Sequence, residues 1–251
     1  MNSNHTFEYS NRRKQELRKF VWSLMEKNKV VKFPGAFNRI PNFIGSEKAA
    51  EKALEIDDLK KAKVVKANPD LAQKPLRELC LKLGKIVYMA VPKLKQEKCF
   101  IELNPKNLKG LESYASTING AFKYGKIIYP TEMEKIDVMI VGCVAVNRKG
   151  AKVGKGGGYS DLEYAIGREF GIISEKTCII TTVHPLQIIS EEIPMEKHDI
   201  CLDWIVTENE IIKTENFYQK PKGIYWDILS KEKIESIPIL KKLKSNTFNF
   251  N

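Results

Sequence analysis

The spacing of apolar and polar residues divides this chain into alternating helices and strands. From residue 10 to 27, apolar side chains recur three and four positions apart, which is the period of an amphipathic helix. Ser10 or Asn11 is expected to cap the start of this helix. The same reasoning predicts helices at 47–56 (capped by Ser46), 75–83, 108–122, 159–170 and within 226–245, the last interrupted at Pro238. Short apolar runs typical of strands occupy 62–66, 85–91, 136–146, 178–183 and 203–207.

The strand at 62–66, the helix at 75–83 and the strand at 85–91 follow one another within about 30 residues. This order is a βαβ unit, and the two strands of such a unit are expected to be parallel. The helix should end at Gly84. Its spacing assigns four residues to the buried face, namely Leu76, Leu79, Cys80 and Leu83.

The run 136–146 is apolar without alternation, as expected of a strand that is covered on both faces. Together with the alternation of helices and strands, it predicts an α/β fold with three layers, α/β/α, around an open and mainly parallel sheet. Ligands bind beyond the carboxyl ends of the strands in such sheets. The stretch 30–45 holds two prolines and two glycines and predicts a loop. We expect one α/β domain over residues 1–251 with a basic N-terminal part, 1–100.

Several classes of protein are disfavoured by composition. No apolar run approaches the roughly 18 residues that a membrane span requires, and the first residues contain no apolar secretory core. We therefore expect no membrane partner. The five cysteines are widely spaced and never form a CxxC pair, which disfavours a zinc ribbon or a disulfide scaffold. We expect a reducing, cytoplasmic location.

The positive charge is concentrated in one part of the chain. The 251 residues hold 42 basic and 31 acidic side chains, for a net charge of +11. Residues 1–100 hold 22 basic and 11 acidic side chains, whereas 101–251 hold 20 of each. A basic lobe attracts an anion such as a nucleotide, a polyanionic small molecule or RNA. Lysine-rich composition is an alternative explanation, and the presence of only 7 arginines argues against RNA readout.

A glycine-rich turn lies between an apolar strand and a helix, at 154–158. Glycine lets the backbone approach a phosphate closely, and successive N–H groups at a helix start attract anions. The sequence is neither a Walker A loop nor a GxGxxG motif, since Tyr159 stands in place of the third glycine. Micromolar affinity needs about 8 kcal/mol, whereas a helix N-terminus supplies about 0.3–1 kcal/mol. Cationic side chains must therefore contribute, unless the turn is only a flexible connector.

Asp161 follows this turn in the first turn of the next helix, and two roles fit it. It can cap the helix. Beside a phosphate, however, a carboxylate repels the ligand unless a cation lies between them, which favours a magnesium ligand. His184 and His198 are expected to be structural hydrogen-bonding residues, and Cys143 an inert core residue.

Three blocks of the sequence resemble the 5-formyltetrahydrofolate cyclo-ligase (5,10-methenyltetrahydrofolate synthetase) family. The first is KQELR at Lys14–Arg18, and the second is the strand and glycine-rich turn from Val141 to Ala165. The third joins Gln187 to the block IPMEKHDICLDWIVTE. The stretch at Arg39–Ser46 and the KPxGIxW tail at 220–226 are similar to a branch called methenyltetrahydrofolate synthetase domain-containing proteins.

The resemblance implies a fold of the ribose-phosphate isomerase and CoA-transferase type, and a ring-closing ligase that uses ATP and Mg²⁺. Its substrate would be a reduced folate, 5-formyltetrahydrofolate, which is converted to 5,10-methenyltetrahydrofolate with release of ADP and phosphate. Asp161 would bind magnesium, and Lys155 and Tyr159 would act at the reacting groups. The residues implied to bind ATP are Lys14, Arg18, Gly154, Lys155, Gly156, Gly157, Gly158 and Tyr159.

Ser160 departs from the family pattern, which has a second tyrosine before the aspartate. A serine keeps a hydroxyl group but loses the aromatic ring, which would weaken substrate positioning or indicate a changed substrate. One alternative function is a catalytically altered nucleotide-binding module that contacts RNA through residues 1–100. Another is an enzyme of the same fold that acts on a sugar phosphate or a CoA ester.

Overall fold

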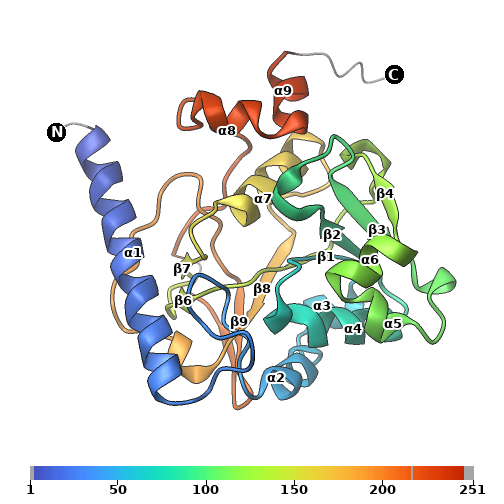
Figure 1. The fold of residues 1–251 in the computed structure, drawn as a ribbon, viewed down its shortest axis with the longest axis horizontal. Helices are drawn as coiled ribbons and strands as arrows, with labels where there is room; N and C mark the ends of the chain where they lie inside the picture. The colour runs from blue at the N-terminus through green and yellow to red at the C-terminus, as the bar shows by residue number, and fades with distance from the viewer. Residues whose placement is uncertain (1–2, 216, 246–251) are drawn as a thin grey trace.

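A central sheet runs through the molecule (Figure 1). This computed structural model describes residues 3–215 and 217–245, and within them eight strands form the sheet. The strands are β1 (Val64–Ala67), β2 (Ile86–Ala90), β3 (Phe100–Leu103), β4 (Lys126–Ile128), β5 (Val138–Ile140), β8 (Cys178–Thr182), β9 (Trp204–Val206) and β10 (Ile211–Lys213). Their order across the sheet is β10-β9-β8-β5-β1-β2-β3-β4.

The middle of the sheet is parallel and its edges are antiparallel. β1 pairs in parallel with β2 and β5, and the parallel pairing continues through β8 to β9. β10 at one edge and β3 and β4 at the other run antiparallel to their neighbours. The predicted βαβ unit and the mainly parallel sheet are therefore confirmed.

Helices cover both faces of the sheet. Successive strand residues point to opposite sides, so apolar side chains emerge on each face and pack against the helices there. Val64 and Met139 pack in one apolar cluster, and their neighbours Val65 and Val138 pack in another. The first cluster includes α7 (Tyr159–Glu169), α8 (Lys231–Glu235) and α9 (Pro238–Lys244). The second includes α2 (Ser46–Ala53), α3 (Asp57–Lys61), α4 (Lys74–Lys82), α5 (Glu112–Ala115) and α6 (Ile118–Tyr124). The predicted three-layer α/β fold is thus confirmed.

The N-terminal helix α1 (Ser3–Lys27) lies beside these layers and packs on a small hairpin (Figure 1). The hairpin consists of β6 (Ala145–Val146) and β7 (Lys152–Val153). Leu17 and Val21 of α1 share an apolar cluster with Ala145 and Val153. This packing brings the middle of α1 to the strand that directly precedes the glycine-rich turn.

Two details predicted for the helices are wrong. Helix α1 begins at Ser3, so Ser10 and Asn11 lie inside it and cap nothing. Leu83 is 57% exposed, whereas Leu76 and Cys80 are buried as expected. The end of α4 explains this difference, since Leu83 follows the last helical residue and no longer keeps the helical period. Gly84 and Gly171 have positive φ after their helices, as expected of helix ends.

The predicted single strand at 136–146 is wrong, because the chain leaves the sheet at Gly142. β5 ends at Ile140, and the later apolar residues enter the β6–β7 hairpin. A Cβ atom at Gly142 would lie 2.8 Å from Gln73 Oε1, so the chain passes where no side chain fits. Apart from the exposed Asp137, the run is buried, but its side chains are distributed over three apolar clusters.

The single helix expected near 108–122 is also wrong, since α5 and α6 form there as two short helices. Thr117 separates them, and its Oγ1 accepts a hydrogen bond from Gly120 N, which caps the start of α6. The sequence analysis did not identify the short edge strands β3, β4 and β10. The helix expected at 47–56 is α2, which starts one residue earlier with Gly45 as its cap.

Among the described helices, none combines the length and the apolarity that crossing a membrane requires. All five cysteines are free and buried. Burial raises the pKa of the Cys143 thiol to about 11, so the thiol is protonated and inert, as its place in an apolar segment predicted.

Candidate functional site

A cavity of about 780 Å³ opens beyond the carboxyl ends of the central strands. Asn68 follows β1, Val91 follows β2 and Gly142 follows β5, and all three line it. The position agrees with the general rule for ligand sites in open α/β sheets. The segment from the glycine-rich turn into α7 supplies further lining residues, namely Gly154, Lys155, Gly157, Gly158, Tyr159, Ser160 and Asp161.

The glycine-rich turn adopts backbone conformations that require glycine. Gly156 has φ +104° and Gly158 has φ +65°, and Gly158 is the left-handed cap of α7. A Cβ atom at Gly157 would lie 2.8 Å from Cδ2 of the Tyr159 ring. The turn follows the hairpin strand β7 rather than a strand of the central sheet, which corrects the placement expected from the sequence.

Helix α1 contributes two cations, Lys14 and Arg18, to this region. The Arg18 side chain donates from Nε to the Gly154 carbonyl oxygen at 2.7 Å. Its guanidinium carbon lies 3.6 Å from the position that a Cβ atom at Gly156 would take. Lys14 is buried and forms an ion pair with Asp199. Lys14 and Arg18 themselves do not line the large cavity.

Asp161 is not a helix cap but the partner of a buried lysine. Its Oδ1 accepts hydrogen bonds from Lys152 Nζ at 2.9 Å and from Ile200 N at 3.1 Å. Burial by itself would raise the pKa of Asp161, but the Lys152 ammonium and the Ile200 N–H hold it below its ordinary value. Burial likewise disfavours the charged form of Lys152, yet Asp161 raises its pKa. Both groups are therefore charged at neutral pH.

Lys155 and Ser160 make contacts with the segment that follows β1. Lys155 Nζ lies 2.9 Å from Asp70 Oδ1, in an ion pair that crosses from the turn to this segment. Ser160 Oγ donates to Asn68 Oδ1 at 3.2 Å. Ser160 thus holds an asparagine in the wall of the cavity.

A second buried ion pair lies below Asn68. Lys66 on β1 pairs with Glu163 on α7, and Asn68 Nδ2 lies 3.5 Å from the same Glu163 oxygen. Burial raises the pKa of Glu163, and the attraction of Lys66 only partly offsets this effect. Glu163 also lines the cavity. Lys66 thus partly neutralises the Glu163 carboxylate. Glu163 lies in the wall of a cavity whose charged lining residues are mostly cationic.

Several residues of this site were not identified from the sequence, including Lys66, Asp70, Lys152, Glu163 and Asp199. Lysines at positions 66 and 152 interrupt short apolar segments, and a buried lysine needs a charged partner. That interruption was the available signal. Asp199 belongs to a block already compared with the family, although nothing in its spacing indicates Lys14 as its partner.

The two histidines differ in their surroundings. His184 caps a short 3₁₀ turn, where its Nδ1 accepts from Leu186 N at 3.1 Å, so it is structural as predicted. His198 Nδ1 is buried and has no hydrogen-bond partner within the described residues. Its Nε2 lies 3.9 Å from Asp199 Oδ1, beside the Lys14 ion pair.

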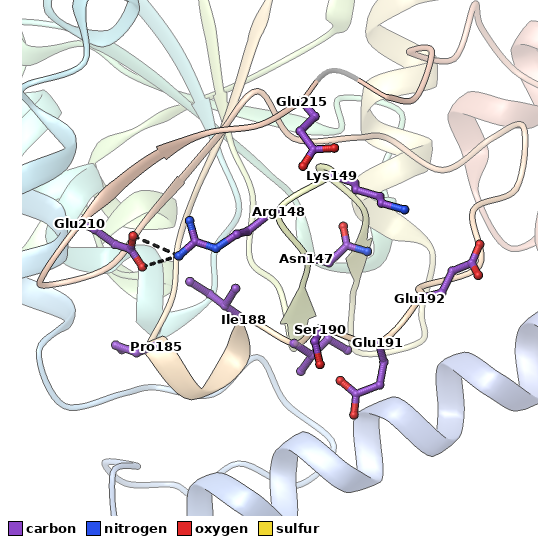
Figure 2. A pocket seen from close by; sticks show the side chains of 11 residues that line it. Asn147, Arg148, Lys149, Pro185, Ile188, Ser190, Glu191, Glu192, Glu210 and Glu215 are labelled. Atoms are coloured by element: carbon purple, nitrogen blue, oxygen red, sulfur yellow. Dashed lines mark hydrogen bonds and ion pairs between the residues drawn. The ribbon is translucent and has the colours of Figure 1, made fainter.

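A smaller cavity of about 480 Å³ lies elsewhere, beside the β6–β7 turn (Figure 2). Arg148 projects into it and pairs with Glu210 at 3.0 Å. Glu191, Glu192 and Glu215 also line it, so acidic side chains outnumber basic ones. An anionic ligand would be repelled there, and none of the site residues predicted from the sequence lines this cavity.

The fit of a magnesium ion can be judged from the acidic side chains. Within residues 3–215 and 217–245, no three His, Cys, Asp or Glu side chains are arranged to hold a metal. Asp161 lines the cavity, and its Oδ2 accepts no hydrogen bond from the described residues. A Mg²⁺ ion is commonly held by one or two carboxylates together with substrate phosphates. The residues present fit that mode of binding.

Comparison with known proteins identifies the family. The family model described as "5-formyltetrahydrofolate cyclo-ligase family" matches residues 10–208, which is most of the chain. The chain belongs to the 5-formyltetrahydrofolate cyclo-ligase family. The membership predicted from the three sequence blocks is therefore confirmed. The cyclo-ligases after which this family is named act on a folate. Helices α8 and α9 of this chain lie beyond the matched residues.

Similar curated proteins carry the name methenyltetrahydrofolate synthase domain-containing protein. The one from Danio rerio is 36% identical over 237 residues, which cover 92% of this chain and 62% of that protein. The one from Homo sapiens is 35% identical, with 92% and 61% covered. The chain thus spans about three fifths of the length of these relatives.

Two solved structures of methenyltetrahydrofolate synthetases also match. The Aquifex aeolicus protein has 20% sequence identity and a TM-score of 0.48, over 81% of this chain and 93% of that one. The Mycoplasma pneumoniae protein has 12% identity and a TM-score of 0.44, over 77% and 97%.

Proposed function

We propose that this protein closes the imidazoline ring of 5,10-methenyltetrahydrofolate from 5-formyltetrahydrofolate, with ATP converted to ADP and phosphate. The single observation that supports this most is the glycine-rich turn, which lines the large cavity and has cationic side chains around it. Phosphoryl transfer depends on positioning and charge neutralisation rather than on a protein nucleophile. The site offers those two elements.

In the proposed reaction, the formyl oxygen attacks the γ-phosphorus of ATP and the bond to ADP breaks. The neighbouring folate nitrogen then attacks the activated formyl carbon, the ring closes and phosphate leaves. Arg18 would hold the conformation of the turn through Gly154 and add positive charge beside it. Lys155 would leave Asp70 to contact the transferred phosphate, and Tyr159 would flank the reacting groups.

Asp161 is the residue that would hold Mg²⁺ in this proposal, through the Oδ2 that its contacts leave open. A bound Mg²⁺ neutralises charge on the nucleotide phosphates. Lys152 keeps Asp161 ionised and oriented from the buried side. The basic N-terminal part would assist both substrates, since folate and ATP are anions.

A direct assay tests the proposal. Purified protein is mixed with 5-formyltetrahydrofolate, ATP and Mg²⁺, and the absorbance of the methenyl product is followed. Turnover is expected for the unmodified chain and for Asp227→Asn, whose carboxylate is exposed and pairs with Lys197. Asp161→Asn should be inactive. No product at any enzyme concentration would contradict the proposal.

A second candidate is a nucleotide-binding module without turnover. The observation in its favour is that Lys155, the lysine assigned to the transferred phosphate, is held in an ion pair by Asp70. The loss of the family's tyrosine at Ser160 points the same way. ATP binding without product formation would favour this module. Steeply salt-dependent RNA binding that is unchanged by ATP would favour an RNA-binding role for the basic residues 1–100.

A further inference from the structure

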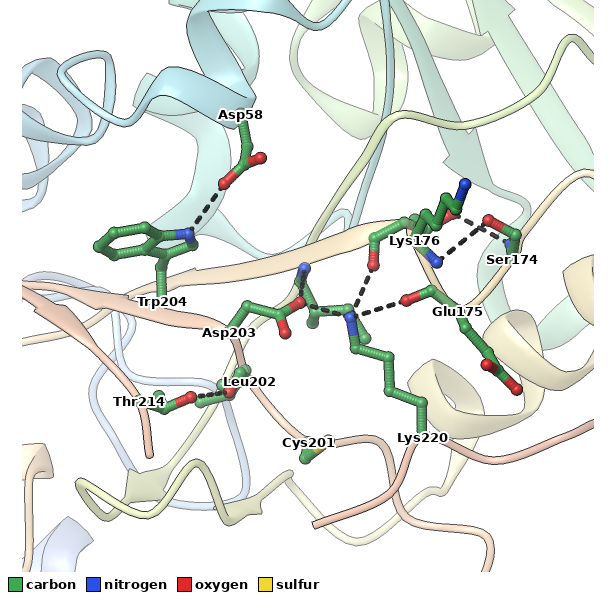
Figure 3. Close-up of polar contacts among 12 residues, drawn as sticks. Asp58, Ser174, Glu175, Lys176, Cys201, Leu202, Asp203, Trp204, Thr214 and Lys220 are labelled. Atoms are coloured by element: carbon green, nitrogen blue, oxygen red, sulfur yellow. Dashed lines mark hydrogen bonds and ion pairs between the residues drawn. The ribbon is translucent and has the colours of Figure 1, made fainter. Parts of the chain in front are cut away.

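The C-terminal segment beyond the family match returns to the glycine-rich turn. Lys220 anchors this segment near the edge of the sheet, where its Nζ donates to Asp203 Oδ2 at 2.6 Å and to the Thr177 carbonyl at 2.9 Å (Figure 3). Ile224 N then donates to Glu169 at the end of α7. The chain is therefore held against α7 before α8 begins.

Helix α8 packs over the same side of the sheet as α7 (Figure 1). Ile234 and Ile237 are buried in the apolar cluster that also contains Leu162 and Ile166 of α7. This packing fixes the direction of the neighbouring side chains on α8. Lys233, directly before Ile234, consequently points toward the start of α7.

Lys233 makes two contacts with the glycine-rich turn. Its Nζ donates to the Gly157 carbonyl oxygen at 3.1 Å and lies 3.6 Å from the centre of the Tyr159 ring. Both partners line the large cavity. A lysine ammonium has three N–H donors, so at least one remains for another acceptor after these contacts.

The absence of a carboxylate partner distinguishes Lys233 from three other lysines close to the turn. Lys14, Lys152 and Lys155 each form an ion pair with an aspartate. Among residues 3–215 and 217–245, no carboxylate pairs with Lys233. A phosphate must compete with a carboxylate for each paired lysine, whereas it meets an uncompensated charge at Lys233.

We propose that Lys233 binds the polyphosphate of the nucleotide, so that the C-terminal helix completes a site whose other parts lie within the family match. The inference rests on the proposed nucleotide site and adds a residue that the matched residues 10–208 do not contain. Lys233 acts through its charge, and its contacts with Gly157 and Tyr159 hold that charge beside the turn.

Isothermal titration calorimetry on the full chain tests this proposal with ATP, ADP, AMP and inorganic tripolyphosphate as ligands. Lys233→Met should weaken the binding of ATP and tripolyphosphate by about tenfold to a hundredfold, the range of one charge-assisted hydrogen bond. AMP, which lacks the outer phosphates, should be affected least. Lys233→Arg should bind like the unmodified chain. The control is Lys231→Met on the same helix, where the side chain is exposed, and no change is expected.

Lys233→Gln separates charge from structure, because glutamine can still donate to the Gly157 carbonyl but carries no charge. Its binding should be as weak as that of Lys233→Met. Unchanged ATP affinity in either variant would overturn the proposal. Tight tripolyphosphate binding without folate turnover would refute the proposed cyclisation and leave the role of Lys233 standing, whereas no polyphosphate binding by the unmodified chain would refute both.

Discussion

Arg18 donates from Nε to the Gly154 carbonyl oxygen at 2.7 Å, across 136 positions of the sequence. This hydrogen bond joins the N-terminal helix to the glycine-rich turn, two parts of the chain that the central sheet does not connect. The guanidinium also lies beside Gly156, where a Cβ atom would approach it to 3.6 Å. The conformation of the turn therefore depends on how α1 is seated.

Replacing Arg18 by methionine should weaken ATP binding by about tenfold to a hundredfold, because one charge-assisted hydrogen bond and one cation are lost. Binding can be measured by titration calorimetry. Arg13→Met on the same helix is the matched control, since Arg13 forms only a partly exposed pair with Glu16. That control should change affinity by less than about twofold. Equal effects of the two substitutions would show that Arg18 has no particular link to the nucleotide.

Asp161→Asn should destabilise the fold as well as abolish activity. It leaves the Lys152 ammonium buried without its carboxylate partner, which typically costs about 3–5 kcal/mol. The double variant Asp161→Asn, Lys152→Met should recover most of the lost stability in urea unfolding, yet remain inactive. Recovery of activity in the double variant would show that Asp161 serves Lys152 alone and holds no metal ion.

The same pair should produce a pH dependence at the acid end. Contacts with Lys152 and Ile200 N outweigh burial and hold the pKa of Asp161 below its unfolded value. The folded chain thus binds fewer protons on this group, and the resulting stability is fully present above the unfolded pKa of about 3.9. It is lost as pH falls through the lower folded pKa. Urea unfolding between pH 6 and the acid limit should therefore show a steeper loss for the unmodified chain than for the double variant.

Local patterns predicted most elements, and their limits have physical reasons. The helix at 159–170 and the strand at 178–183 match α7 and β8 closely, because each keeps its period and ends at a recognisable residue. The run 136–146 does not form one strand. Residues buried in the central sheet and residues buried in the β6–β7 hairpin are equally apolar, so the sequence does not distinguish the two environments. Hydrophobicity alone does not record where a chain leaves a sheet.

Long-range ion pairs were beyond sequence analysis for a different reason. Lys14 and Asp199 are 185 positions apart, and no periodic pattern relates residues at that separation. The glycine-rich turn could be recognised because its conformational demands are local, at Gly156 and Gly158. Lys233 could not be recognised from the sequence, since its position beside the turn depends on how the C-terminal segment folds back over α7.

Gly157→Val should reduce turnover while leaving the fold intact. The new Cβ atom would lie 2.8 Å from the Tyr159 ring and push it from its position. Because Gly157 is exposed and the clash involves a single side chain, the free energy of unfolding should fall by no more than about 1–3 kcal/mol. Gly154→Ala offers a comparison, since a Cβ atom there meets nothing within 4 Å, and its loss of turnover should be smaller. Normal kcat and KM in Gly157→Val would argue against close phosphate approach at this residue.

Lys66 and Glu163 should be coupled in stability and in folate recognition. Lys66→Met removes the cation from a buried carboxylate, so the free energy of unfolding should fall by about 3–5 kcal/mol. Lys66→Met combined with Glu163→Gln should restore most of that loss. Because Glu163 lines the cavity, both variants should bind reduced folate more weakly while their ATP affinity stays unchanged. The matched control is Lys74→Met, whose part-buried pair with Glu78 lies within α4 and does not line the cavity. If the double variant binds folate like the unmodified chain, the pair serves stability only.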